Sequence, residues 1–151
     1  MSSINNENVQ KFKSYGFVLT PVHKSKDPDV DKTPLTNAKT NYKWSNRVGY
    51  EWNDQELLDA NRLGVWHEDS KIFDVDFDDK DFIAHKFIDM LPPTFTIGKK
   101  VNGRTIATHL IYRTTENVKD YKKAQPLVEL LGNTQTIIAG VDRVIIDDRE
   151  P

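Results

Sequence analysis

Apolar residues at helical spacing predict three helices. They cover 6–14, the segment from a cap at Asn53 or Asp54 through Arg62, and 78–90. The first is expected to end at Gly16, because glycine readily adopts the left-handed conformation that terminates helices. In the third, Ile83, Phe87 and Met90 are spaced to lie on a buried face, and the prolines that follow stop the helix.

Short runs rich in β-branched and aromatic residues predict strands between these helices. They cover 17–22, 63–67, 71–77 and 94–113, with two or three more in LVELLG and TQTIIAGVDRVII. Within 94–113, Asn102-Gly103 separates two alternating runs and predicts a tight hairpin, because both central turn positions need a positive φ. The sum is an α+β fold, a mostly antiparallel mixed sheet with flanking helices, in a single domain over residues 1–151.

Composition narrows the protein class without indicating an activity. The chain has 151 residues and no cysteine, so disulfides and thiolate metal sites are excluded and a reducing cytoplasm is the expected location. No apolar run reaches the length of a membrane span, and the polar start excludes a signal peptide. The net charge is −2, so a nucleic-acid partner would have to bind to local basic patches.

Five aspartates lie among bulky apolar residues in KIFDVDFDDKDF, residues 71–82. A calcium-binding EF-hand loop is excluded, because the glycine and glutamate that it requires are missing. Side chains alternate along a strand, so Asp74 and Asp76 lie roughly 7 Å apart on one face, where they could hold Mg²⁺ or Mn²⁺. The alternative is an edge strand with two solvated aspartates. Three further acids are expected only to begin the helix that follows: Asp78, Asp79 and Asp81.

Positive side chains surround the hairpin that comes next. Lys99, Lys100 and Arg104 flank its turn, His109 lies on the returning strand, and Arg113 ends that strand. Lysine and arginine beside a metal site are typical of phosphate binding. The alternatives are lysines that keep an exposed edge soluble, and a histidine that belongs to the core.

A third acid, Glu129, stands inside the apolar run LVELL. Burial of an unpaired carboxylate is costly. A metal, a cation or exposure on an edge strand must therefore account for it.

The order of these motifs resembles the catalytic core of the archaeo-eukaryotic primase superfamily, most of all the primase-polymerase (prim-pol) domains of phages and plasmids. That family carries an Asp-x-Asp strand, a small-x-His strand and a later lone acid in a strand, which FDVDFDD, ATHLIYR and VELLG repeat over roughly residues 8–140. The resemblance implies metal binding by Asp74, Asp76 and Glu129, and contact of His109 with nucleotide phosphates. The compact Gly-Gly-Arg-His element of the family is interrupted here. The other nucleotide-binding cations therefore stay open among Lys99, Lys100, Arg104 and Arg113.

The implied activity is that of a DNA primase/polymerase. The resemblance implies template-directed transfer of nucleotides, from deoxy- or ribonucleoside triphosphates, to a primer 3′-OH or an initiating nucleotide at two Mg²⁺ or Mn²⁺ ions. Expected partners are a single-stranded DNA template and primer, nucleoside triphosphates and a replicative helicase, and no membrane. The expected location is the cytoplasm, which would be the host cytoplasm for a viral protein. Tyr42 and Trp44 are candidates for stacking on template bases, with core packing as the alternative for Trp44. The chain is either a minimal catalytic domain or the N-terminal part of a longer replication protein.

Two other classes of function remain open. A metal-dependent nuclease would also combine acids with lysine, and the Pro-Asp pair at 28–29 with DYK at 120–122 loosely resembles restriction-type nucleases. A non-catalytic module would keep the fold and bind nucleotide or nucleic acid within a replication complex. Retention of both aspartates, His109 and Glu129 favours the enzyme.

Overall fold

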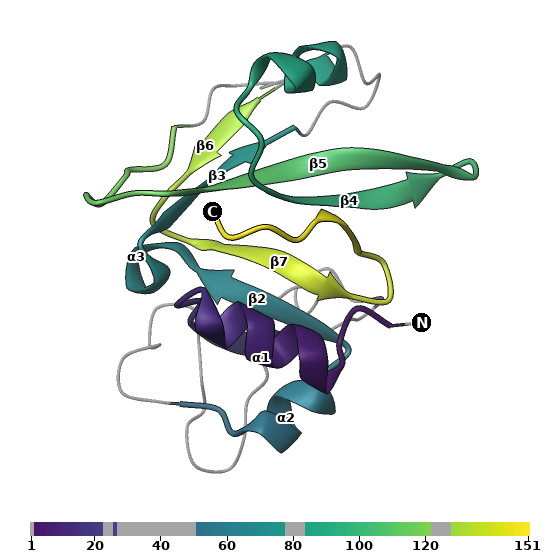
Figure 1. Cartoon of the computed structure of the whole chain (residues 1–151), viewed down its shortest axis with the longest axis vertical. Coiled ribbons are helices and arrows are strands. Elements are labelled where there is room, and N and C mark those ends of the chain that lie inside the picture. The colour runs from purple at the N-terminus through teal and green to yellow at the C-terminus, as the bar shows by residue number, and fades with distance from the viewer. Residues whose placement is uncertain (1, 23–25, 27–50, 78–83, 122–127) are drawn as a thin grey trace.

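The computed structural model describes residues 2–22, 26, 51–77, 84–121 and 128–151 (Figure 1). Several sequence-based expectations lie outside these ranges. They concern the Pro-Asp pair at 28–29, Tyr42 and Trp44, Lys122, and the helix start with Asp78, Asp79, Asp81 and Ile83.

The described strands form two antiparallel sheets (Figure 1). The smaller sheet has the order β1 (Leu19–Val22), β2 (Arg62–Trp66) and β7 (Gln135–Gly140). The larger has the order β6 (Glu129–Leu131), β3 (Ile72–Asp76), β5 (Arg104–Arg113), β4 (Phe95–Val101) and β8 (Val144–Asp147). The α+β class is therefore confirmed. The expected single mixed sheet is wrong, because each described strand pairing is antiparallel and the strands divide between two sheets.

Two helices begin where the sequence predicts. Helix α1 (Asn6–Ser14) is capped by Asn5, whose side chain accepts a hydrogen bond from the Asn8 backbone N–H at 2.9 Å. Helix α2 (Asp54–Leu58) begins with a capping box at Asn53 but ends well before the predicted Arg62, which belongs to β2. No described helix is long and apolar enough to cross a membrane.

The predicted third helix differs in type and in its buried face. Its described part is a 3₁₀ helix, η2 (Ala84–Met90). Phe87 and Met90 are 50% and 77% exposed, so the prediction that they face the core is wrong. Ile88 and Leu91, which are also three residues apart and so share a face of a 3₁₀ helix, pack inward instead.

A core of apolar side chains joins the two sheets to α1 and α2. Phe95 of β4 is fully buried and makes edge-to-face contacts with Phe12 and Phe17, at centroid distances of 5.8 and 5.4 Å. The rest of this core comes from both sheets and both helices, including Val9, Leu57, Leu63, Val65, Ile72, Ile97, Ile111 and Ile138.

Strand β3 is covered on both faces, and its side chains alternate as predicted. Ile72 packs into the core between the sheets, whereas Val75 and Phe77 pack with Leu110 on the other side of β3. Asp74 and Asp76 share the face of Ile72, because side chains two residues apart point the same way. Both acids therefore face inward, toward the gap between the sheets.

The β4–β5 hairpin forms at the predicted turn. Asn102 and Gly103 have φ angles of 50° and 76°, the left-handed values that a tight two-residue turn requires. The paired strands project to one side of the molecule (Figure 1).

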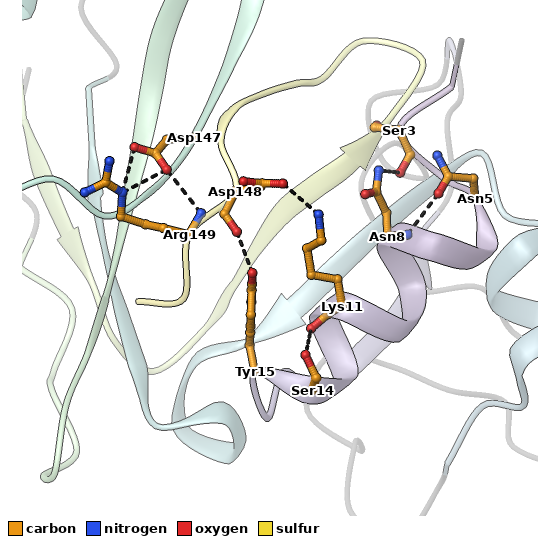
Figure 2. Close-up of polar contacts among 9 residues, drawn as sticks. All are labelled: Ser3, Asn5, Asn8, Lys11, Ser14, Tyr15, Asp147, Asp148 and Arg149. Atoms are coloured by element: carbon orange, nitrogen blue, oxygen red, sulfur yellow. Dashed lines mark hydrogen bonds and ion pairs between the residues drawn. The ribbon is translucent and has the colours of Figure 1, made fainter.

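The segment after β8 contacts α1 through polar side chains (Figure 2). Lys11 forms an ion pair with Asp148 at 2.6 Å, and the Tyr15 hydroxyl donates to the Asp148 carbonyl at 2.6 Å. Asp147 accepts from Arg149 next to this contact. These bonds hold α1 against the edge of the larger sheet.

Candidate active site

Three of the predicted site residues form one row across the larger sheet. Asp76 of β3 is the register partner of Glu129 on β6 and of His109 on β5. Directly opposed residues of neighbouring strands point to the same face. Asp74 shares that face from two positions earlier on β3, so strand pairing gathers all four residues.

Asp74 is the most deeply buried member of this group, with no exposed surface. Its Oδ2 accepts a hydrogen bond from Nδ1 of His109 at 2.7 Å. The same nitrogen lies 3.5 Å from Oδ1 of Asp76, so the imidazole stands between the two carboxylates.

Two residues that the sequence analysis missed complete the surroundings of Asp74. Thr136 of β7 donates its hydroxyl hydrogen to Asp74 Oδ2 at 2.7 Å, across the gap between the sheets. His67, which opens α3 (His67–Ser70), lies with its Nε2 at 2.7 Å from the Thr136 hydroxyl. These contacts join residues more than sixty positions apart, so no local pattern indicates them.

The two aspartates favour the protonated form of His109. Burial lowers its pKa, but the charge of Asp74, the hydrogen bond to Asp74 and the charge of Asp76 outweigh burial, and the pKa lies above its ordinary value. Arg143 acts in the opposite direction. Because Nδ1 is engaged by the carboxylates, protonation leaves Nε2–H as a second donor of the ring.

A cavity of about 820 Å³ opens beside this row of residues. Asp76, His109 and Thr136 form part of its wall, while Asp74 is buried behind them. Two of the predicted cations, Lys99 and Lys100, also line it. The wall carries four lysines and arginines against two aspartates, so it is locally positive on a chain of net charge −2.

The other two cations of the wall are Arg62 and Arg143, neither of which the sequence analysis identified. Arg62 forms a forked ion pair with Asp142, with Nε–Oδ1 and Nη2–Oδ2 distances of 3.2 and 2.5 Å. Arg143 lies 3.4 Å from the same carboxylate. Asp142 therefore holds two guanidinium groups at one end of the cavity.

The structure does not bring the remaining predicted cations to the cavity. Arg104 is exposed beside the hairpin turn and does not line the wall. Arg113, at the opposite end of β5, donates to the carbonyls of Ser70 and Tyr15 at 3.0 and 2.5 Å. Its contacts tie β5 to α1 and α3.

The donor chemistry of the site fits a hard divalent cation. Oδ1 of Asp74 is buried and has no hydrogen-bond partner among the described residues, so it is a carboxylate oxygen left over for a ligand. Asp76 reaches the cavity, and Glu129 lies in register beside it. As the side chains stand, no three acidic or histidine groups of the described residues are placed to hold a metal ion. Cation binding at Oδ1 of Asp74 can leave Oδ2 on His109 and Thr136, and would require Asp76 and Glu129 to turn toward the ion.

The part of the nuclease-like pattern that the structure describes has a structural role. Asp120 accepts hydrogen bonds from the backbone N–H groups of Gly132 and Asn133, at 2.7 and 2.9 Å, and thereby shapes the turn between β6 and β7.

No protein-family model matches the chain, and a search of curated proteins finds no match. Function is therefore inferred from the side chains of the site and from the order of the motifs.

Proposed function

We propose that this protein is a DNA primase/polymerase that transfers nucleotides from nucleoside triphosphates to a primer 3′-OH or an initiating nucleotide. The observation that carries the proposal is the row Glu129, Asp76 and His109, backed by Asp74, at the wall of a positive cavity. In the reaction, the attacking oxygen bonds to the α-phosphorus and its proton passes to solvent, while the bond from the α-phosphorus to the α–β bridging oxygen breaks and pyrophosphate leaves.

Acidic residues beside basic ones suit this reaction, because the metal ions bind to anionic oxygens and the triphosphate binds to cations. Asp74, Asp76 and Glu129 are the oxygen donors that would hold Mg²⁺ or Mn²⁺. When bound, such an ion supplies Lewis-acid activation of the hydroxyl and neutralises charge on the phosphates.

The chain's own cations address the triphosphate. Protonated His109 can donate from Nε2 to a phosphate oxygen while Nδ1 stays on Asp74. Lys99 and Lys100 line the same cavity and attract the phosphates as point charges. The positive wall also suits a single-stranded template, although the overall charge of the chain is negative.

A primer-extension assay tests the proposal. The purified chain is given a primed single-stranded template with deoxy- or ribonucleoside triphosphates and either Mg²⁺ or Mn²⁺. We expect extension by the unmodified protein, and a loss of about a hundredfold or more in Asp76→Asn, which removes a charge but keeps the side-chain shape. Asp89→Asn, at an exposed position of η2, is the matched control and should leave the rate unchanged.

Each alternative class of function predicts a different outcome, in this assay or in calorimetry with nucleotide. Shortening of the DNA by the unmodified protein, with or without nucleotides, would replace the proposal with a nuclease. Calorimetric binding of nucleotide without any extension would indicate a non-catalytic module. Full activity of Asp76→Asn would exclude the assigned site.

A further inference from the structure

A series of buried hydrogen bonds runs from α3 through the smaller sheet to Asp74. The backbone N–H of Thr134 lies 3.3 Å from Nδ1 of His67, and Nε2 of His67 lies 2.7 Å from the Thr136 hydroxyl. Thr136 in turn donates to Asp74 Oδ2 at 2.7 Å. His67, Thr136 and Asp74 are all buried, so these hydrogen bonds are stronger than they would be in water.

The partners determine the direction of each bond. A backbone N–H can only donate, so Nδ1 of His67 accepts and the ring hydrogen of the neutral imidazole lies on Nε2. That N–H donates to the Thr136 oxygen, whose single hydrogen goes to Asp74. Every donor in the series therefore points toward the Asp74 carboxylate.

The start of the series is itself held in place. His67 also donates its backbone N–H to the Thr134 carbonyl at 3.0 Å, so the two residues are bonded twice. The turn that carries Thr134 is shaped by Asp120 and packed closely at Gly132, where a Cβ would lie 2.0 Å from the Val118 carbonyl oxygen. The conformation of this turn therefore fixes the position of His67.

The two donors on Oδ2 define which oxygen of Asp74 is left over. Oδ2 accepts from both His109 and Thr136, whereas Oδ1 is buried with no hydrogen-bond partner among the described residues. Without Thr136, the carboxylate would be held from one side only, and the two oxygens could exchange places.

We propose that Thr136 and His67 are positioning residues, which fix the orientation of the Asp74 carboxylate so that Oδ1 is presented for cation binding and nucleotidyl transfer. This inference rests on the proposed function. It adds that the smaller sheet, which carries Thr136, sets the geometry of an acid on the larger sheet.

The test compares Thr136→Val, which removes the hydroxyl at similar volume, with Thr136→Ser, which keeps it. Thr96→Val is the matched control, since Thr96 is also a buried strand threonine but donates to the nearby Thr94 carbonyl. In primer extension, we expect kcat of Thr136→Val to fall about 10- to 100-fold while KM for the nucleotide stays within about twofold. Thr136→Ser should recover kcat to within about threefold, and Thr96→Val should match the unmodified protein.

A second readout needs no activity. Nitrogen NMR of ¹⁵N-histidine protein reports which ring nitrogen carries the hydrogen. We expect His67 as the Nε2–H tautomer in the unmodified chain, and altered His109 ring signals in Thr136→Val but not in Thr136→Ser or Thr96→Val.

The two readouts separate the two hypotheses. Absence of extension by the unmodified protein would refute the proposed function, and the NMR comparison would still decide the positioning role. An Nδ1–H tautomer of His67 would overturn the inference, because it reverses the series. Unchanged His109 signals in Thr136→Val would overturn it too, as would equal loss of kcat in the valine and serine variants.

Discussion

Replacement of Asp142 by asparagine should weaken the fold and strengthen triphosphate binding at the same time. The Asp142 carboxylate accepts a forked pair of hydrogen bonds from the buried Arg62 and lies 3.4 Å from Arg143. Asparagine keeps the shape of the side chain but removes its charge. The fork is thereby reduced to a single neutral acceptor.

The expected loss of stability follows from the two bonds to Arg62. Hydrogen bonds to charged groups contribute about 1.5–3 kcal/mol, but the Asp142 side chain is 32% exposed and solvent screens the pair. We therefore expect the free energy of unfolding to fall by about 1–2 kcal/mol. At an m-value of about 2 kcal/mol/M, the urea midpoint should drop by about 0.5–1 M with no change in m.

The pH dependence has a definite sign. Burial raises the pKa of Asp142, but the Arg62 hydrogen bond and the charges of Arg143 and Arg62 outweigh it, so the folded-state pKa lies below the ordinary value. The stabilisation by Asp142 is therefore present above its unfolded pKa of about 3.9 and is lost as the pH falls through the folded value. The difference in stability between the unmodified protein and Asp142→Asn should be constant near neutral pH and shrink below about pH 4.

Urea unfolding followed by circular dichroism between pH 3 and pH 8 measures both effects. Asp148→Asn is the control, because it breaks a solvent-exposed ion pair with Lys11 and should shift the midpoint less. Equal midpoints for Asp142→Asn and the unmodified protein at pH 7 would refute the assigned role of the fork. A difference that grows on acidification would refute the sign.

The same substitution removes one of the two aspartates that line the cavity. A unit charge at ~8 Å in a water-like dielectric contributes about 0.5 kcal/mol, so triphosphate affinity measured by calorimetry should rise about twofold at low salt. Weaker binding in Asp142→Asn would show that the carboxylate orders its arginines for the ligand rather than opposing it by charge.

Three further substitutions probe the cavity and the β4–β5 hairpin beside it. Lys99→Ala should weaken nucleoside triphosphate binding about three- to tenfold in calorimetry. Arg113→Ala, which removes contacts to α1 and α3, should instead lower the melting temperature and leave that affinity unchanged. The reverse pattern would place the phosphate site at the other end of β5. Gly98→Ala should destabilise the β4–β5 hairpin strongly, because a Cβ there would lie 2.2 Å from the Ile106 carbonyl oxygen. An unchanged melting temperature in thermal denaturation would show that the strands separate easily.

The predictions that succeeded depend on local chemistry. Asn102 and Gly103 select the hairpin turn through their own φ angles. Asn53 caps α2 through contacts that lie within three residues. The common face of Asp74 and Asp76 needs only the period of a strand.

The predictions that failed depend on partners distant in sequence or on a change of helix type. The segment before Arg62 has helical spacing, but Arg62 pairs with both Val22 and Gly140, and the sheet overrides the helix. Phe87 and Met90 were placed on a buried face by helical spacing, but the face of η2 that packs against the sheet carries Ile88, and Leu91 follows it. The division into two sheets could not be predicted, because no pattern within β2 or β7 specifies their pairing.

The predicted and the missed site residues differ in the same way. Asp74, Asp76, His109 and Glu129 lie on adjacent strands of the larger sheet, where motif order and strand period bring them together. Thr136 and Arg62 reach the site from the smaller sheet. Asp74, Asp76, Glu129 and the two lysines therefore belong to the larger sheet, whereas Arg62 and the donor that orients Asp74 belong to the smaller one. A substrate in this cavity would contact both sheets, so the packing between them controls the distance from phosphate-binding cations to acids. Core residues such as Ile138, which joins β7 to that packing, thus affect the site without touching it.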